Sequence, residues 1–214
     1  MRKPLLLLLI LTAGLILVSC AGASPTGVTT DTERPLSTGG TSEAAADVAL
    51  ATVALSARLD EIDSAIVVWR GATSVEQARA AAETAANLVV GPNGPGYGDR
   101  DGDGIIGGNT DVGVLPGLDG TPAGLAVELD ANECVVSDVL GGAWSDAGAR
   151  WEEMLSAIDR WRPDNNTMPS LASHPMRIVG WASFSMESES LEEIQTFGGH
   201  ANIHIQVSLR ALDC

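Results

Sequence analysis

Lysine is nearly absent from this sequence. The only one is Lys3, and every later basic residue is an arginine. Beyond Lys3, the chain therefore has no lysine for Schiff-base chemistry. Basic residues as a whole are also scarce, because 12 lysines and arginines face 28 aspartates and glutamates, which gives a formal net charge of −16. Such an acidic chain repels phosphate backbones and anionic lipid head groups, so we expect no nucleic-acid partner.

The sequence also lacks several short motifs that mark catalytic and nucleotide-binding sites. It contains no G-x-S-x-G nucleophile elbow, no P-loop and no paired-cysteine zinc motif. Ser183 lies in a Gly-Trp-Ala-Ser-Phe stretch, which lacks the second glycine of the elbow. These absences favour a binding or structural protein over an enzyme.

The N-terminus has the parts of a bacterial secretion signal in their usual order. Arg2 and Lys3 precede an apolar run over 5–18 that is too short for an ordinary membrane-spanning helix. The run leads into Leu-Val-Ser-Cys, ending at Cys20, which resembles the lipobox of bacterial lipoproteins. This resemblance implies that 1–19 is a signal peptide and that the Cys20 thiol carries lipid. The alternative is an ordinary signal peptide with an incidental cysteine.

A lipidated Cys20 predicts an extracytoplasmic protein, attached to a bacterial membrane by its anchor. One acyl chain binds a bilayer only marginally, so stable attachment uses the several chains that bacterial lipoproteins carry. Residues 20–41 are rich in Ser, Thr, Gly and Pro, and we expect a flexible tether there, followed by a folded domain at 42–214. The membrane is the first expected partner, and an envelope or secreted protein is the second.

Cysteine is another scarce residue, with three in the chain. If Cys20 carries lipid, Cys134 and Cys214 remain, in a compartment that permits disulfides. We expect a Cys134–Cys214 bridge, which would tie the last residue to the middle of the fold. The alternative is two free thiols.

Hydrophobic periodicity predicts an all-α domain. Apolar or small residues recur with helical spacing in four segments: 42–70, 73–90, 144–162 and 190–212. Segment 175–186 fits either a helix or a strand, and we favour the helix because every other element is helical. We therefore expect an up-down bundle of about four main helices, with a long crossover at 91–125 between the second and the third.

The crossover is rich in glycine and aspartate and contains Asp-Arg-Asp-Gly-Asp-Gly at 99–104. A hard cation such as Ca²⁺ needs six to eight oxygen ligands, and alternating carboxylates supply several of them. This spacing resembles the first half of the calcium loops of EF-hand and dockerin proteins. The resemblance implies side-chain ligands at Asp99, Asp101 and Asp103, and a backbone carbonyl ligand at Ile105.

The second half of the loop departs from that pattern. The position of the closing carboxylate is Thr110, and Asp111 comes one residue later. We expect Asp111 to complete the coordination shell, with Asp119 as the alternative and water in the remaining positions. Extracellular calcium modules have dissociation constants of roughly 10⁻⁴ to 10⁻³ M, which would make Ca²⁺ a permanent structural cofactor. An Asp/Gly-rich turn that binds nothing is the competing interpretation.

Two histidines, His200 and His204, lie four residues apart in the last predicted helix. Side chains at this spacing share a helix face and can chelate a transition metal. No glutamate lies between them as in the H-E-x-x-H pattern, and the third histidine, His174, has no predicted relation to them. Two partly buried histidines bonded to neighbouring groups are the simpler interpretation.

The predicted function is that of an envelope-anchored lipoprotein that binds Ca²⁺ structurally and has a non-catalytic binding or structural role. The alternative is a transition-metal-binding protein or metal-dependent enzyme that uses His200 and His204. A third hypothesis is docking to a secreted protein through the loop, as dockerins do, but dockerins carry two copies of the loop and this chain carries one.

Overall fold

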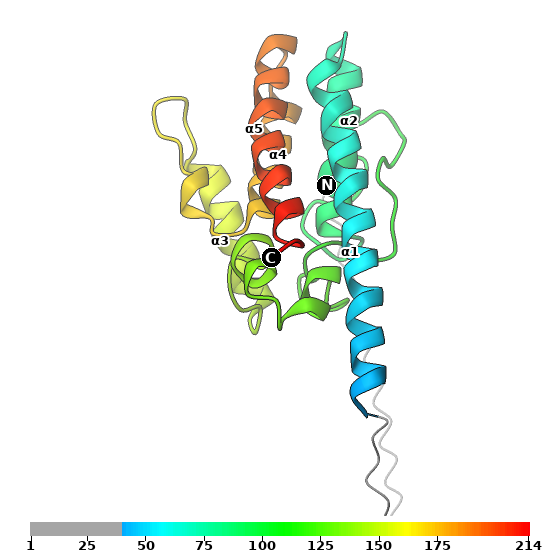
Figure 1. Ribbon diagram of the computed structural model, residues 1–214. Coiled ribbons are helices and arrows are strands. Elements are labelled where there is room, and N and C mark those ends of the chain that lie inside the picture. Colours follow the sequence, from blue (N-terminus) through cyan, green and yellow to red (C-terminus); the bar gives the residue numbers. More distant parts are fainter. Residues whose placement is uncertain (1–39) are drawn as a thin grey trace, which may run out of the picture. The chain divides into compact units, whose positions relative to one another are not determined.

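The computed structural model describes residues 40–214, which form an all-α fold (Figure 1). The all-α prediction is therefore confirmed. The predicted signal peptide at 1–19, the lipidated Cys20 and nearly all of the tether lie outside the described residues. Within 40–214, no helix combines the length and the apolar character that a membrane crossing requires.

Five α-helices carry the described fold: α1 (Gly40–Gly71), α2 (Val75–Val90), α3 (Ala147–Arg160), α4 (His174–Glu187) and α5 (Leu191–Arg210). Three short elements lie between them: the 3₁₀ helices η1 (Leu125–Leu129) and η3 (Met168–Ser170), and the π-helix η2 (Val135–Leu140). The ambiguous segment 175–186 falls within α4, so the helical interpretation is correct. Ser173 caps α4 by accepting a hydrogen bond from the Met176 backbone N–H at 3.3 Å.

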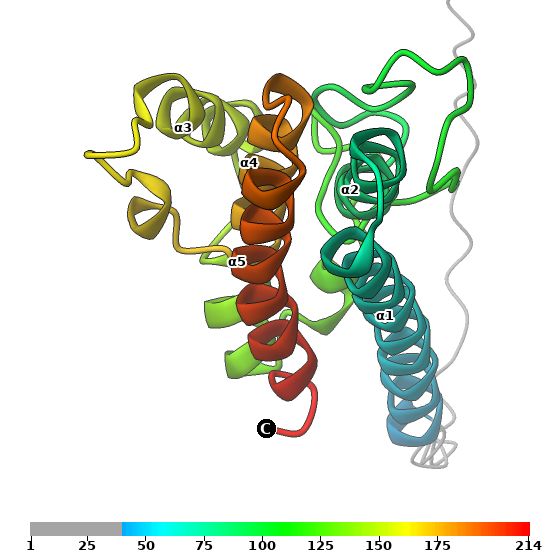
Figure 2. The same ribbon diagram turned by 90° about the horizontal axis from the view of Figure 1, so that it is seen from above.

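Four of these helices enclose the main core (Figures 1 and 2). α1 packs against α2 and α5, and α4 packs against α5 and α2, whereas α3 contacts the others mainly through α4. The predicted apolar stripe of α1 is fully buried from its middle onward, at Leu55, Leu59, Ile62, Ile66 and Trp69. Val48, in the same stripe, is 50% exposed. Figure 1 shows that the first turns of α1 extend beyond the other helices.

The pair α1 and α5 depends on a glycine at their contact. A Cβ on Gly198 would lie 2.9 Å from Cγ of Arg70 and 3.1 Å from the ring of Trp69. The Trp69 indole N–H also donates a hydrogen bond to the Ile194 carbonyl at 2.9 Å. Glycine in a helix interior is unfavourable, yet α5 is continuous across Gly198, and the close approach to α1 explains why a small residue lies there.

The crossover between α2 and η1 contributes its own residues to the core. Val114 and Leu115 are fully buried, and their backbone N–H groups donate to the carbonyls of Leu88 and Val89 at the end of α2, at 3.3 and 3.1 Å. Farther along, the Pro116 carbonyl accepts a hydrogen bond from the Trp151 indole at 2.9 Å. These contacts hold the second half of the crossover in place.

The structure also joins Cys134 to Cys214 in the predicted disulfide. Their Cα atoms are 6.1 Å apart, within the range that a disulfide requires. Cys134 precedes η2 and Cys214 follows α5, so the bond links the C-terminus to the far end of the crossover region.

Candidate metal centre

Two polar residues of α2, Glu83 and Asn87, are buried where the helix faces the first half of the crossover. Glu83 is 1% exposed and Asn87 is 0% exposed. They lie one helical turn apart and therefore project from the same face. Buried polar groups need hydrogen-bond partners, and both residues find theirs in the backbone of the crossover.

The carboxylate of Glu83 accepts hydrogen bonds from three backbone N–H groups. Oε2 accepts from Arg100 and from Asp101 (3.1 Å), and Oε1 accepts from Gly107 (2.7 Å). A carboxylate has about four lone-pair positions, so one on Oε1 stays available to an ion. One side chain thus fixes both ends of the Asp-rich loop.

Asn87 also holds the loop at two points, Gly98 and Gly107, through its side-chain amide. Nδ2 donates to the carbonyls of Gly98 (2.8 Å) and Gly107 (2.7 Å), and Oδ1 accepts from the Gly98 backbone N–H at 3.2 Å. Gly107 lies so close to α2 that a Cβ on it would be 2.5 Å from Oγ1 of Thr84. The loop is therefore held tightly on the helix, and glycine is required at the contact.

Asp99 and Asp101 converge with Glu83 in an acidic triad. Each residue offers one carboxylate oxygen, and the three oxygens all lie within 4.8 Å of one another. The Asp99 carboxylate also accepts from the backbone N–H groups of Gly102 (2.7 Å) and Gly104 (2.9 Å), which fold the loop around it. Three carboxylates at this separation repel one another, and a bound cation would remove the repulsion, so the triad could hold a metal ion.

The pKa of Asp101 shows that its charge is poorly compensated by the protein. Burial raises this pKa, and the nearby carboxylates of Glu83, Asp103 and Asp99 raise it further, although a hydrogen bond from the Asp103 backbone N–H lowers it. A raised pKa means that the ionised form of the carboxyl is unfavourable in its surroundings. A divalent cation among these oxygens would favour the ionised form.

A positive charge, Arg100, lies beside the triad. Its Nε donates to Oδ1 of Asn87 at 3.3 Å, and Nη2 donates to the Pro95 carbonyl at 3.0 Å. Burial lowers the pKa of Arg100 to about 10, and the negative charge of Glu83 opposes that shift. Arg100 therefore stays protonated at neutral pH, offsets part of the triad's negative charge, and leaves an excess that suits a cation.

The predicted ligands are only partly brought together. Asp99 and Asp101 belong to the triad, whereas Asp103 and Asp111 do not. Asp103 accepts a hydrogen bond from the Ile105 backbone N–H at 2.7 Å, and the Ile105 side chain is 68% exposed. The roles of Asp103, Ile105 and Asp111 as ligands stay predictions.

The sequence patterns did not indicate Glu83, the residue around which the loop is built. In the helix predicted at 73–90, Glu83 and Asn87 interrupt a run of alanines with i, i+4 spacing. A carboxylate and an amide on one face of an alanine-rich helix, directly before an aspartate-rich loop, are the signal that would have indicated a contact.

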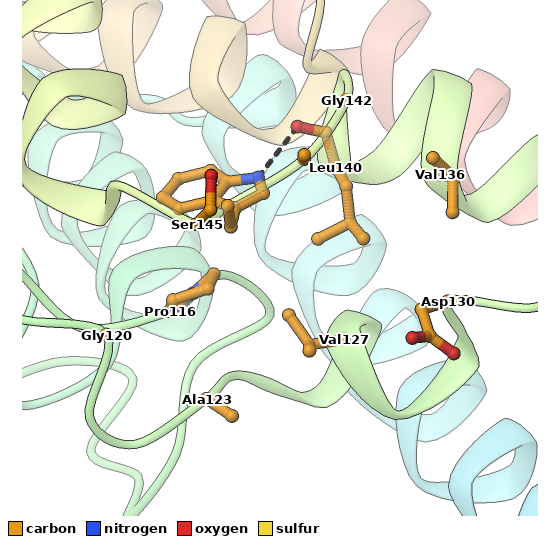
Figure 3. A pocket seen from close by; sticks show the side chains of 11 residues that line it. Pro116, Gly120, Ala123, Val127, Asp130, Val136, Leu140, Gly142 and Ser145 are labelled. Carbon is orange, nitrogen blue, oxygen red and sulfur yellow. Dashed lines mark hydrogen bonds between the residues drawn. The ribbon is translucent and has the colours of Figure 1, made fainter.

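A separate cleft of about 440 Å³ lies along the second half of the crossover (Figure 3). Its apolar lining includes Pro116, Val127, Val136 and Leu140, with the single carboxylate of Asp130 at one side. The indole N–H of Trp144 closes one wall by donating to the Leu140 carbonyl at 2.9 Å. None of the triad residues lines this cleft, so the cleft and the triad are distinct sites on one crossover.

The histidines pair differently from the arrangement that their spacing predicts. The Nδ1 atoms of His204 and His174 lie 3.0 Å apart. The ring of His200 instead stacks on Trp181, with ring centroids 4.4 Å apart and planes inclined by 18°. Sequence spacing does not predict the pairing of His174 with His204, because the pair forms only when α4 packs against α5.

No family model matches the sequence, and comparisons with curated proteins and with solved structures gave no significant match. The proposed function is therefore based on the geometry of the triad and on the sequence of the N-terminus.

Proposed function

We propose that this protein is a bacterial envelope lipoprotein, anchored through Cys20, whose crossover binds Ca²⁺ as a structural cofactor. The observation that supports ion binding is the convergence of Asp99 and Asp101 on the buried carboxylate of Glu83. In this proposal an up-down bundle of α1, α2, α4 and α5 is the scaffold. Its role is non-catalytic binding at the cell envelope.

Ca²⁺ fits this site better than Mg²⁺ does. Ca²⁺ accepts six to eight oxygens in irregular geometry, whereas Mg²⁺ requires a near-ideal octahedron and keeps several waters. In the proposed shell, Glu83 supplies from the preceding helix the carboxylate that Thr110 cannot supply from the end of the loop. Asp103, the Ile105 carbonyl and water provide further oxygens.

Ca²⁺ should raise the midpoint of thermal unfolding relative to EDTA. An ion that binds only the folded state stabilises it by about 2.7 kcal/mol at a hundredfold excess over the dissociation constant. For a domain of this size, that corresponds to a rise of roughly 5–10 °C. Circular dichroism melts at matched ionic strength, in Ca²⁺, in Mg²⁺ and in EDTA, measure the shift.

Two conservative variants identify the shell. Asp101→Asn should abolish most of the shift, because it removes a charged ligand of the triad, whereas Asp111→Asn should preserve the shift if Glu83 closes the shell. Loss of the shift in Asp111→Asn would assign the closing ligand to Asp111. An equal midpoint in Ca²⁺ and EDTA for the unaltered protein would dismiss the calcium site.

The anchor has its own test, independent of the ion. The protein produced in a bacterial host should partition into the detergent phase of a Triton X-114 separation, because acyl chains on Cys20 add a large apolar surface. Cys20→Ser should move it to the aqueous phase, and mass spectrometry should show the loss of the lipid mass. An unaltered chain that lacks a lipid mass and stays in the aqueous phase would contradict the lipobox interpretation.

A further inference from the structure

We propose that His174 and His204 form a second metal site, which takes a transition-metal ion, with Cu²⁺ as the preferred one. His174 is the first residue of α4, and His204 lies in the second half of α5. Their Nδ1 atoms face each other at 3.0 Å. Imidazole nitrogen is a preferred ligand of Cu²⁺, Ni²⁺ and Zn²⁺ and a poor one for Ca²⁺, so this site and the acidic triad select different ions.

The separation of the two nitrogens indicates the coordination geometry. An ion about 2.0–2.1 Å from each nitrogen would make an N–metal–N angle of roughly 95° at this separation. That angle fits two neighbouring positions of a square-planar or tetragonal ion, which is the geometry of Cu²⁺ and Ni²⁺. A linear arrangement would need the nitrogens about 4 Å apart, at the same bond length. Among the divalent ions of the first transition row, Cu²⁺ binds most strongly to such ligands.

Both imidazoles are neutral at neutral pH, as metal ligation requires. The pKa of His204 is lowered to about 3, mainly by burial and further by His174, Arg177 and His200. The pKa of His174 is also lowered, again mainly by burial. Without metal, the Nδ1–H group of one ring donates a hydrogen bond to the unprotonated Nδ1 of the other. On ligation that proton moves to Nε2 of its own ring, and both Nδ1 lone pairs bind the ion.

The charges around the pair limit its affinity without blocking it. Asp138 on η2 favours a positive charge near His174, whereas Arg177 on α4 and Arg210 on α5 oppose it. The Arg177 guanidinium is engaged elsewhere, since its Nε donates to the Leu171 carbonyl at 2.7 Å. Among the described residues, no third imidazole, thiol or carboxylate lies close enough to form a three-ligand group with the pair. Water therefore fills the remaining positions, which leaves the ion open to exchange.

His200 provides a matched control on the same helix. Its ring is stacked on Trp181, whereas His204 faces His174. A chelate of the i, i+4 type would use His200 and His204, and the pair across the two helices uses His174 and His204. Three single substitutions to glutamine separate these arrangements.

The test is a titration of the full chain with Cu²⁺, with Ca²⁺ in excess so that the acidic triad is saturated. Electron paramagnetic resonance should show one tightly bound Cu²⁺ with hyperfine coupling to two imidazole nitrogens. His174→Gln and His204→Gln should each weaken binding at least tenfold, because even the loss of a residue that merely orients a ligand costs about 10–100-fold. His200→Gln should stay within about twofold of the unaltered chain, as expected for a residue outside the shell.

Three results would overturn the proposal. Equal Cu²⁺ binding by a His174→Gln/His204→Gln double variant would place the ion elsewhere. A loss in His200→Gln as large as in His204→Gln, with His174→Gln unaffected, would assign the i, i+4 chelate. If the unaltered chain is folded by circular dichroism but shows no coupling to two imidazole nitrogens, both arrangements are wrong.

Discussion

Replacing Glu83 with alanine should lower the free energy of unfolding by at least about 3 kcal/mol, even in the absence of any ion. The Glu83 carboxylate is the acceptor for the backbone N–H groups of Arg100, Asp101 and Gly107. A hydrogen bond to a charged group contributes about 1.5–3 kcal/mol, and a buried donor without an acceptor costs about 1–3 kcal/mol. Relief of the repulsion between Glu83 and the two aspartates offsets only part of this loss. Urea unfolding in EDTA, followed by circular dichroism, measures the change.

The proposed Ca²⁺ site predicts a second effect at the same residue. Glu83→Gln keeps an acceptor oxygen but removes the charge, so it should lose less stability than Glu83→Ala and still lose the Ca²⁺-dependent increase. Glu76→Gln, in the first turn of the same helix and exposed, should lower the free energy of unfolding far less than Glu83→Ala does and should leave the Ca²⁺-dependent increase unchanged. If Glu83→Ala unfolded at the same urea concentration as Glu76→Gln, the crossover would be held by its other contacts and the role assigned to Glu83 would be wrong.

Hydrogen exchange reports directly on these bonds. The amides of Asp101 and Gly107 should be protected in the unaltered protein, although both residues lie in a glycine-rich loop, because they donate to a buried carboxylate. In Glu83→Ala their protection should fall, while the amides of Val114 and Leu115, which are bonded to the end of α2, stay protected. A uniform loss across all four amides would mean that the variant unfolds as a whole.

The helices were predictable from sequence because apolar periodicity records which face is buried. Leu55, Leu59 and Ile62 are fully buried, as their spacing predicts. Periodicity does not show where a helix extends beyond its neighbours, so it does not predict the exposure of Val48. Periodicity also did not show which helices form the main core. Both α3 and α4 carry apolar residues, but α4 packs between α2 and α5, whereas α3 contacts mainly α4.

The acidic triad was predictable only in part. Alternating aspartates at Asp99 and Asp101 have a local signature, since ligands two residues apart converge in a tight loop. The third carboxylate of the triad comes from α2, and its approach depends on the glycine at 107 and on the hydrogen bonds of Asn87. Such a contact is created by tertiary packing, and the sequence shows only that a carboxylate interrupts a run of alanines. The pairing of His174 with His204 was unpredictable for the same reason.

Replacing both Cys134 and Cys214 with serine should lower the free energy of unfolding by about 4 kcal/mol, because the bond removes conformational freedom from the unfolded chain. The two cysteines are 80 residues apart in sequence, so the closed loop spans η2, α3, α4 and α5. With a denaturant slope of about 2 kcal/mol per molar urea, the unfolding midpoint should fall by about 2 M. Urea titrations of the oxidised protein and of the double variant measure this difference.

Chemical reduction of the unaltered protein distinguishes the effect of losing the disulfide from the effect of replacing two cysteine side chains. If the disulfide acts mainly by restricting the unfolded chain, the reduced protein and the Cys134→Ser/Cys214→Ser variant should unfold at nearly the same urea concentration. The Ca²⁺-dependent increase should persist in both, because the acidic triad lies on α2 and the first half of the crossover, outside the closed loop. A variant that matched the oxidised protein would show that the bond contributes little. A variant that lost its response to Ca²⁺ would show that the disulfide positions the metal centre as well as stabilising the helices that follow it.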